Sequence, residues 1–191
     1  MVDFTKRADK AAGSRLGGTE TMLAGTNVTP VPFQWAGSAA TGGAIAGGLV
    51  GAAIGATVDK RRELRHGEEA ARSLPDLASR PQASAAVPAN GALLGVTDQR
   101  LLAWKISGLG KPKDLLFEIP FPDIDRVAWH EADTKWLGGS PRSTLIWIGL
   151  TDGTVIPMAA ISFGPGGKYA GAVMSALIDR LGGKVTEFSG D

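Results

Sequence analysis

The sequence predicts a mainly β domain that ends in one α-helix, and two observations carry this prediction. In the C-terminal half, short apolar runs rich in β-branched residues recur at brief intervals, each bounded by turn residues. Near the end of the chain Tyr169, Val173, Leu177 and Leu181 follow helical spacing, and Gly182 ends that pattern. Short antiparallel strands followed by one amphipathic helix are typical of a partly open barrel or sandwich closed by the helix.

The apolar runs predict six strands. They are expected at residues 92–97, 100–107, 114–119, 125–131, 143–150 and 154–160, and the helix at residues 168–181. Asp152 and Gly153 form a tight-turn pair between the last two runs, which indicates a β-hairpin. Trp104, Trp129 and Trp147 lie on predicted strands, where we expect them to pack in or beside the core.

Three short stretches resemble bacterial pleckstrin-homology-like (PH-like) domains. Residues 95–102 (GVTDQRLL) resemble the hairpin between the second and third strands of that family, and residues 119–127 (IPFPDIDRV) resemble a later step into a strand. Residues 150–153 (LTDG) match a further hairpin, and the final helix is in the expected place. The resemblance covers residues 92–183 and implies a PH-like fold that binds partners rather than catalysing a reaction.

The PH-like family also requires a first strand, and its best candidate is residues 20–28 (ETMLAGTNV). In that case residues 29–90 are an insertion after strand one. Members that bind inositol phosphates carry a basic cluster in the first hairpin, whereas here Arg100 and Lys105 are isolated. The resemblance therefore implies no particular ligand.

Residues 37–58 form a stretch of 22 residues without a charge, made of seven Gly, seven Ala, five Ile, Leu or Val, and three Ser or Thr. Gly43, Gly47, Gly51 and Gly55 recur every four residues and would lie along one face of a helix. This pattern, a glycine zipper, is typical of helices that pack closely against another helix. We therefore expect a separate Gly/Ala-rich helix that self-associates or pairs with a partner.

The same stretch is long enough, at roughly 33 Å as a helix, to cross a membrane. Trp35 would lie at one interface and Lys60, Arg61 and Arg62 at the other, which places the C-terminal domain in the cytoplasm. A single span, however, would separate the candidate first strand from the other strands. Either that strand lies elsewhere, or the stretch re-enters the membrane or lies on it, or it is a soluble helix at an oligomer interface. A flexible Ala/Gly linker is the remaining alternative.

The other segments are assigned by composition. Residues 59–74 are densely charged with opposite charges four residues apart, as in an exposed helix, and residues 75–90 read as a Pro/Ala-rich linker. The N-terminal residues 1–18 are expected to be a flexible tail that could include a short helix near residues 3–12. The rest of the expected division is a possible first strand and Pro-rich connection at 19–36, the glycine zipper at 37–58, the charged helix at 59–74, the linker at 75–90, the PH-like domain at 91–183 and a second tail at 184–191.

Composition and motifs argue against several functional classes. The chain has 20 Lys and Arg against 19 Asp and Glu, so we expect no nucleic-acid partner. It has no cysteine, and His66 and His130 show no metal-ligand spacing, so we expect neither a metal nor another cofactor. The loop at 164–168 (GPGGK) lacks the spacing of a phosphate-binding loop, and no nucleophile motif is present. We therefore expect neither a nucleotide site nor catalytic residues.

One loop is a candidate contact surface. Lys135, Trp136, Leu137 and Arg142 place an aromatic and an aliphatic side chain beside two cations between predicted strands. Such a loop suits a membrane interface or a protein partner, although it can also fold back over the end of the barrel. The sequence thus predicts a bacterial, membrane-associated scaffolding protein with a cytoplasmic PH-like module. The alternatives are a glycine-zipper pore and a soluble dimer, in the cytoplasm, that binds a small ligand.

Overall fold

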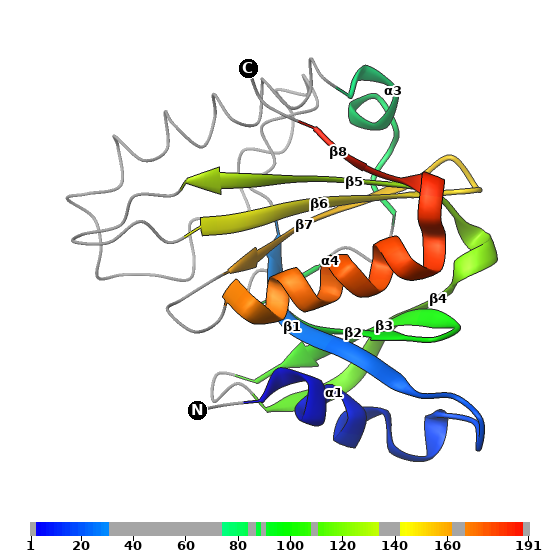
Figure 1. The fold of residues 1–191 in the computed structure, drawn as a ribbon, viewed down its shortest axis with the longest axis vertical. Helices are drawn as coiled ribbons and strands as arrows, with labels where there is room; N and C mark the ends of the chain where they lie inside the picture. The colour runs from blue at the N-terminus through cyan, green and yellow to red at the C-terminus, as the bar shows by residue number, and fades with distance from the viewer. Residues whose placement is uncertain are drawn as a thin grey trace.

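The computed structural model describes residues 3–30, 74–83, 87–88, 91–107, 111–133, 142–161 and 167–188. Their strands form one eight-stranded mixed sheet with the order β4-β3-β2-β1-β7-β6-β5-β8. Helix α4 (Gly167–Leu181) crosses the sheet between its two groups of strands (Figure 1). The strands at the two ends of this order, β4 and β8, are not paired with each other among the described residues, so the sheet does not close.

The predicted strands and the C-terminal helix are confirmed, with bounds that shift by at most two residues. They are β2 (Ala92–Thr97), β3 (Arg100–Ile106), β4 (Pro112–Pro120), β5 (Ile124–Asp133), β6 (Arg142–Leu150), β7 (Val155–Ile161) and α4. The hairpin at Asp152-Gly153 is also present. There Gly153 has φ +83° and Asp152 accepts hydrogen bonds from the backbone and hydroxyl of Thr154.

Strand β1 (Met22–Pro30) joins the two halves of the sheet. It pairs antiparallel with β2 from Met22 to Val28, and its last residues pair with β7, where Pro30 lies opposite Met158. The strand expected at residues 20–28 therefore exists two residues further along the chain. Through it, β1–β4 and β5–β7 become one continuous sheet.

The main core lies between the inner face of the sheet and α4. Each strand of this core contributes alternate residues, such as Leu94 on β2 and Ile146 on β6, and α4 contributes Val173 and Leu177, all four fully buried. The helical spacing seen in the sequence is thus the buried face of α4. This confirms that α4 closes one side of the sheet.

The outer face of the sheet is also covered, which explains why the strands read as nearly continuous apolar runs rather than as an alternation. Helix α1 (Phe4–Ala12) lies over β1–β4, where Leu93, Leu102 and Trp104 are buried. The short helix α3 (Pro75–Ala78), the residues that follow it and Phe188 lie over β5–β7, where Ala128, Trp147 and Val155 are buried. Figure 1 shows α1 and α3 at opposite ends of the molecule.

Three segments are more ordered than a tail or linker composition predicts. Residues 4–12 form α1, which agrees with the short helix expected near residues 3–12, and the chain continues into the 3-10 turn η1 (Gly13–Arg15). Helix α1 is held on the sheet because Ala8 and Ala12 are small enough to pack tightly on β1. Part of the expected linker is ordered, because Leu77 and Val87 are buried. Residues 182–187, partly within the expected second tail, form the 3-10 turn η4 (Gly182–Lys184) and strand β8 (Val185–Glu187).

The expected glycine-zipper helix and the charged helix after it lie outside the described residues. Among the residues that the structure does describe, no helix is long and apolar enough to cross a membrane.

Candidate functional site

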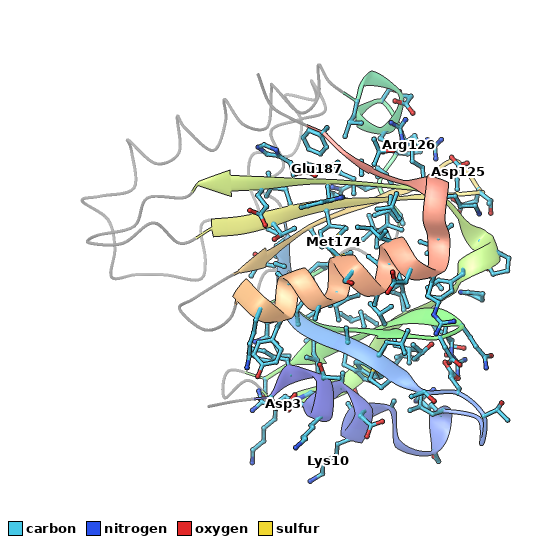
Figure 2. All side chains as sticks on the ribbon, in the orientation of Figure 1. Asp3, Lys10, Asp125, Arg126, Met174 and Glu187 are labelled. Carbon is cyan, nitrogen blue, oxygen red and sulfur yellow. The ribbon has the colours of Figure 1, made fainter. Side chains whose placement is uncertain are left out.

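A groove of about 240 Å³ lies between α4 and strands β5 and β6. Seven residues line it, namely Trp129 and Glu131 of β5, Thr144 of β6, and Gly171, Met174, Ser175 and Ile178 of α4. Figure 2 shows Met174 on the side of α4 that faces the strands. The groove is open to solvent, because Gly171, Ser175 and Glu131 are exposed.

The groove has an apolar floor with polar groups at its sides. Met174 is 3% exposed and belongs to the main core, while Trp129 packs against that core and is half-buried. Ile178 is 44% exposed, which makes it the most exposed large hydrophobic side chain among the described residues. Thr144, Ser175 and Glu131 add hydroxyl and carboxylate groups. This combination suits a bound peptide, whose apolar side chain would lie on the floor while its backbone meets the polar groups at the sides.

Beside the groove runs the edge of β5. Strand β8 pairs with β5 in parallel, but only at Val127, Ala128 and Trp129. The described pairing with β8 therefore ends at Trp129, whereas β5 continues to Asp133. An edge of this kind can accept an extended segment by adding a strand to the sheet.

The outer side of the same edge holds an aromatic cluster. Phe188 is 6% exposed, and its ring centroid lies 5.0 Å from that of Trp147 and 5.1 Å from that of His130. His130 Nδ1 lies 2.8 Å from the carbonyl oxygen of Phe188, which can only accept, so Nδ1 carries the proton. His130 is therefore a half-buried partner of the C-terminal segment.

Arg100, isolated in the sequence, is held by three parts of the chain. Its guanidinium donates to both carboxylate oxygens of Glu20, at 2.9 and 2.6 Å, to the carbonyl of Arg15 at 2.7 Å, and to Glu118. The hydrogen bonds and charge of Glu20 raise the pKa of Arg100. Burial raises the pKa of Glu20, but hydrogen bonds and the positive charge of Arg100 outweigh it, so the pKa is lowered. This arginine is thus engaged inside the protein and does not offer a phosphate site.

Most residues predicted as sites lie outside the described part of the chain. These are Gly43, Gly47, Gly51, Gly55, Trp35, Lys60, Arg61, Arg62, Lys135, Trp136 and Leu137. The backbone of Arg142 opens β6, opposite Asp133, and its side chain is not described. Among the described residues, no group of three or more His, Asp and Glu side chains is arranged to hold a metal ion.

The groove and the β5 edge are brought together by the fold from parts of the chain that the sequence analysis did not connect. Trp129 was expected as core packing, and Ile178 lies next to the positions that define the buried face of α4. A large aliphatic residue on the polar side of a helix was the one sequence signal that pointed to this surface.

A scan against protein-family models gives no match for this chain, and a search of curated proteins gives none either.

Proposed function

We propose that this protein is a non-catalytic scaffolding protein whose PH-like module binds an extended segment of a protein partner in the groove between α4 and β5. The observation that carries the proposal is the exposed Ile178 above an apolar floor, in a groove that lies directly beside the β5 edge of the sheet. An extended segment can pair with such an edge and place an apolar side chain in the groove.

Three features support the assignment to the PH-like type. Strands β2 to β4 and β5 to β7 each form an antiparallel meander, β1 pairs with both groups, and α4 lies across the sheet. The hairpin and strand-entry stretches that carry the resemblance fall at β2–β3, β4–β5 and β6–β7. The inserted residues lie between β1 and β2, as the resemblance implies.

The size of the groove argues for a peptide rather than a small ligand. Pockets for small molecules measure roughly 300–1,000 Å³ and enclose most of the ligand. A groove of about 240 Å³ that opens to solvent holds little more than one or two side chains. The soluble small-ligand alternative is therefore less well supported than partner binding.

Peptide display on the intact chain tests the proposal. We expect selection of peptides with a large apolar residue, and loss of their binding in Ile178→Arg. The matched control is Asp179→Arg, which places the same cation on the next exposed residue of α4, outside the groove. Equal binding by both variants, or no enrichment of peptides on the wild-type chain, would contradict the proposal.

The membrane part of the proposal concerns how residues 31–73 are attached. Before them, Pro30 pairs with Met158 of β7, and after them Gln82 pairs with Val155 of the same strand. Val155 and Met158 are roughly 10 Å apart along β7, so the segments before and after residues 31–73 both pack on the same folded body. We therefore propose that the glycine zipper associates with the membrane from the cytoplasmic side, or with a second copy, without a single crossing.

Cysteine labelling tests this topology, since the chain has no cysteine of its own. Single cysteines at the exposed positions Lys10 and Asp152 lie before and after the inserted segment. We expect both to be protected from an impermeant thiol reagent in intact cells and labelled after the cells are opened. Labelling of Lys10→Cys alone in intact cells would show a single crossing. If the purified chain does not float with anionic liposomes, the proposed membrane association is contradicted.

A further inference from the structure

The edge of β5 needs a partner strand, and the chain supplies one from its own C-terminus. Val127, Ala128 and Trp129 form an uncharged run, with the first two fully buried, as is usual for an interior strand. The opposite edge, β4, is protected differently, by Pro112 and Pro120 at its ends and by exposed charges between them. The β5 edge lacks such protection at its centre, and β8 covers it instead.

Strand β8 is attached by few contacts. It has three residues, of which Thr186 and Glu187 are exposed and Val185 is half-buried (Figure 2 labels Glu187). Lys184 Nζ donates to the carbonyl of Ile124 at 2.6 Å. Phe188 follows directly, and its N–H donates to the carbonyl of Trp129 at 2.9 Å.

The connection before β8 allows it to move without disturbing α4. Gly182 and Gly183 separate the two elements, and Gly182 has φ +53°, which glycine adopts at little cost. Helix α4 is anchored independently through Val173, Met174 and Leu177 in the main core. The segment from Lys184 to Phe188 is therefore held by the β5 edge and by the aromatic cluster around Phe188.

We infer that the β5 edge, together with the pocket filled by Phe188, is a strand-binding site that β8 occupies within the same molecule. Its external ligand is an extended segment of a protein partner that pairs in parallel with β5 and places an aromatic side chain between Trp147 and His130. Binding of that segment displaces β8. The regulatory meaning rests on the proposed function, because Trp129, the last residue of β5 that pairs with β8, also lines the groove.

The site can be tested by adding the segment that occupies it, β8 with the residues around it, as a separate peptide. The probe is a fluorescently labelled peptide with the sequence of residues 184–191, KVTEFSGD. In the wild-type chain the tethered segment competes at an effective concentration on the order of millimolar, so we expect weak binding. In full-length Phe188→Ala the tethered segment loses its anchor while the pocket remains. Fluorescence anisotropy is expected to show an affinity at least about tenfold higher.

A disulfide provides the reversible control. Val127 and Val185 are register partners in the parallel pair, and neighbouring strands bring Cα atoms within the range that a disulfide spans. In the full-length double variant Val127→Cys and Val185→Cys, the oxidised form holds β8 in place and is expected to bind no peptide. Reduction is expected to restore the weak binding of the wild-type chain.

Two results would overturn the inference. One is equal affinity of the peptide for the wild-type and Phe188→Ala chains, and the other is equal binding of a peptide that has alanine in place of its phenylalanine. If Phe188→Ala is not folded, peptide binding that is the same in the oxidised and reduced double variant also overturns it. The Ile178→Arg test is independent of these, so a failure of the groove proposal is distinguishable from a failure of the β8 site.

Discussion

The two halves of the sheet are both covered on their outer faces, but by different kinds of structure. Over β1–β4, α1 approaches so closely that a Cβ atom on Gly25 would lie 2.7 Å from the carbonyl oxygen of Phe4 and 2.9 Å from Cβ of Ala8. The chain between α1 and β1 is held by the bidentate ion pair between Arg100 and Glu20. The side chain of Glu20 is 3% exposed. This cover is closely packed and depends on a buried charge.

The cover over β5–β7 is made of extended pieces. Leu77 packs over Gly149, while Arg80 pairs with Asp125 and Arg126 with Asp76. Both carboxylates are about half exposed, at 46% and 53% of the side chain, and Asp125 and Arg126 lie at the α3 end of β5 (Figure 2). The first cover is therefore fixed by a close backbone approach and a buried ion pair, whereas the second is held by buried apolar side chains and by ion pairs that are partly exposed.

The largest effect is expected from Gly25→Val. The new side chain meets the backbone of α1, which cannot retreat without losing its contacts on β1, so we expect a loss of about 3 kcal/mol in the free energy of unfolding. Urea unfolding measures it. Gly153→Ala is unsuitable as a control because of its positive φ, whereas Gly171→Ala on α4 has nothing within 4 Å of the added Cβ and should be neutral or slightly stabilising. A loss below about 0.5 kcal/mol for Gly25→Val would show that α1 is not closely packed.

A slightly smaller effect, about 2–3 kcal/mol, is expected from Glu20→Gln, because Arg100 loses its buried carboxylate partner and keeps only the more exposed Glu118. The change also alters the pH dependence. The folded protein lowers the pKa of Glu20, so its contribution is complete above the ordinary value of 4.5 and is lost as the pH falls through the lower folded pKa. Acid unfolding curves of the wild-type chain should therefore steepen below about pH 4.5 relative to Glu20→Gln. Parallel curves would contradict this.

For the second cover, Leu77→Ala is expected to cost about 2 kcal/mol, because a buried side chain is lost at the edge of the molecule. The loss should appear locally. The amides of Ala83 and Val155, which donate to the carbonyls of Val155 and Pro81, should exchange hydrogen faster, while those of β2 and β3 should not change. Ser79→Ala, at an exposed position on the same segment, is the control. Equal acceleration throughout the sheet would show that both covers belong to one cooperative unit.

The smallest effect is expected from Arg126→Gln, which removes the exposed pair with Asp76. Exposed pairs contribute about 0–1 kcal/mol and are screened by salt, so we expect a loss of less than about 0.5 kcal/mol that disappears at high ionic strength. Thermal unfolding at low and high salt measures it. A loss as large as that of Glu20→Gln would remove the distinction between the two covers.

The strands and the final helix could be predicted from local patterns because periodicity and turn residues act over a few residues. The β6–β7 hairpin needs only Asp152 and Gly153, and the buried face of α4 is visible in its spacing. The position of the outer covers on the sheet could not be predicted, although a short helix was expected near residues 3–12. Residues 4–12 and 184–188 are mostly polar, and their few apolar groups gain a burial partner only after the sheet has formed.

The candidate site shows the same division. The sequence pointed to residues that the structure mostly leaves undescribed, and the groove arose from residues that were expected only to pack or to face solvent. Trp129 and Ile178 are 49 positions apart in the chain and meet because α4 folds back over β5. A local sequence pattern covers only a few residues, so it cannot predict a contact between residues so far apart in the chain.

By itself, the sequence determined which segments become strands, which face of the last helix is buried, and that residues 37–58 form a separate uncharged segment. Only the tertiary structure decided that β1 joins the two halves, that both ends of residues 31–73 rejoin one body at β7, and that Phe188 occupies the outer pocket of β5. The physical reason is the range of the interactions. Hydrogen-bond propensity and periodicity are local, whereas strand order, edge pairing and burial depend on contacts between residues far apart in the chain.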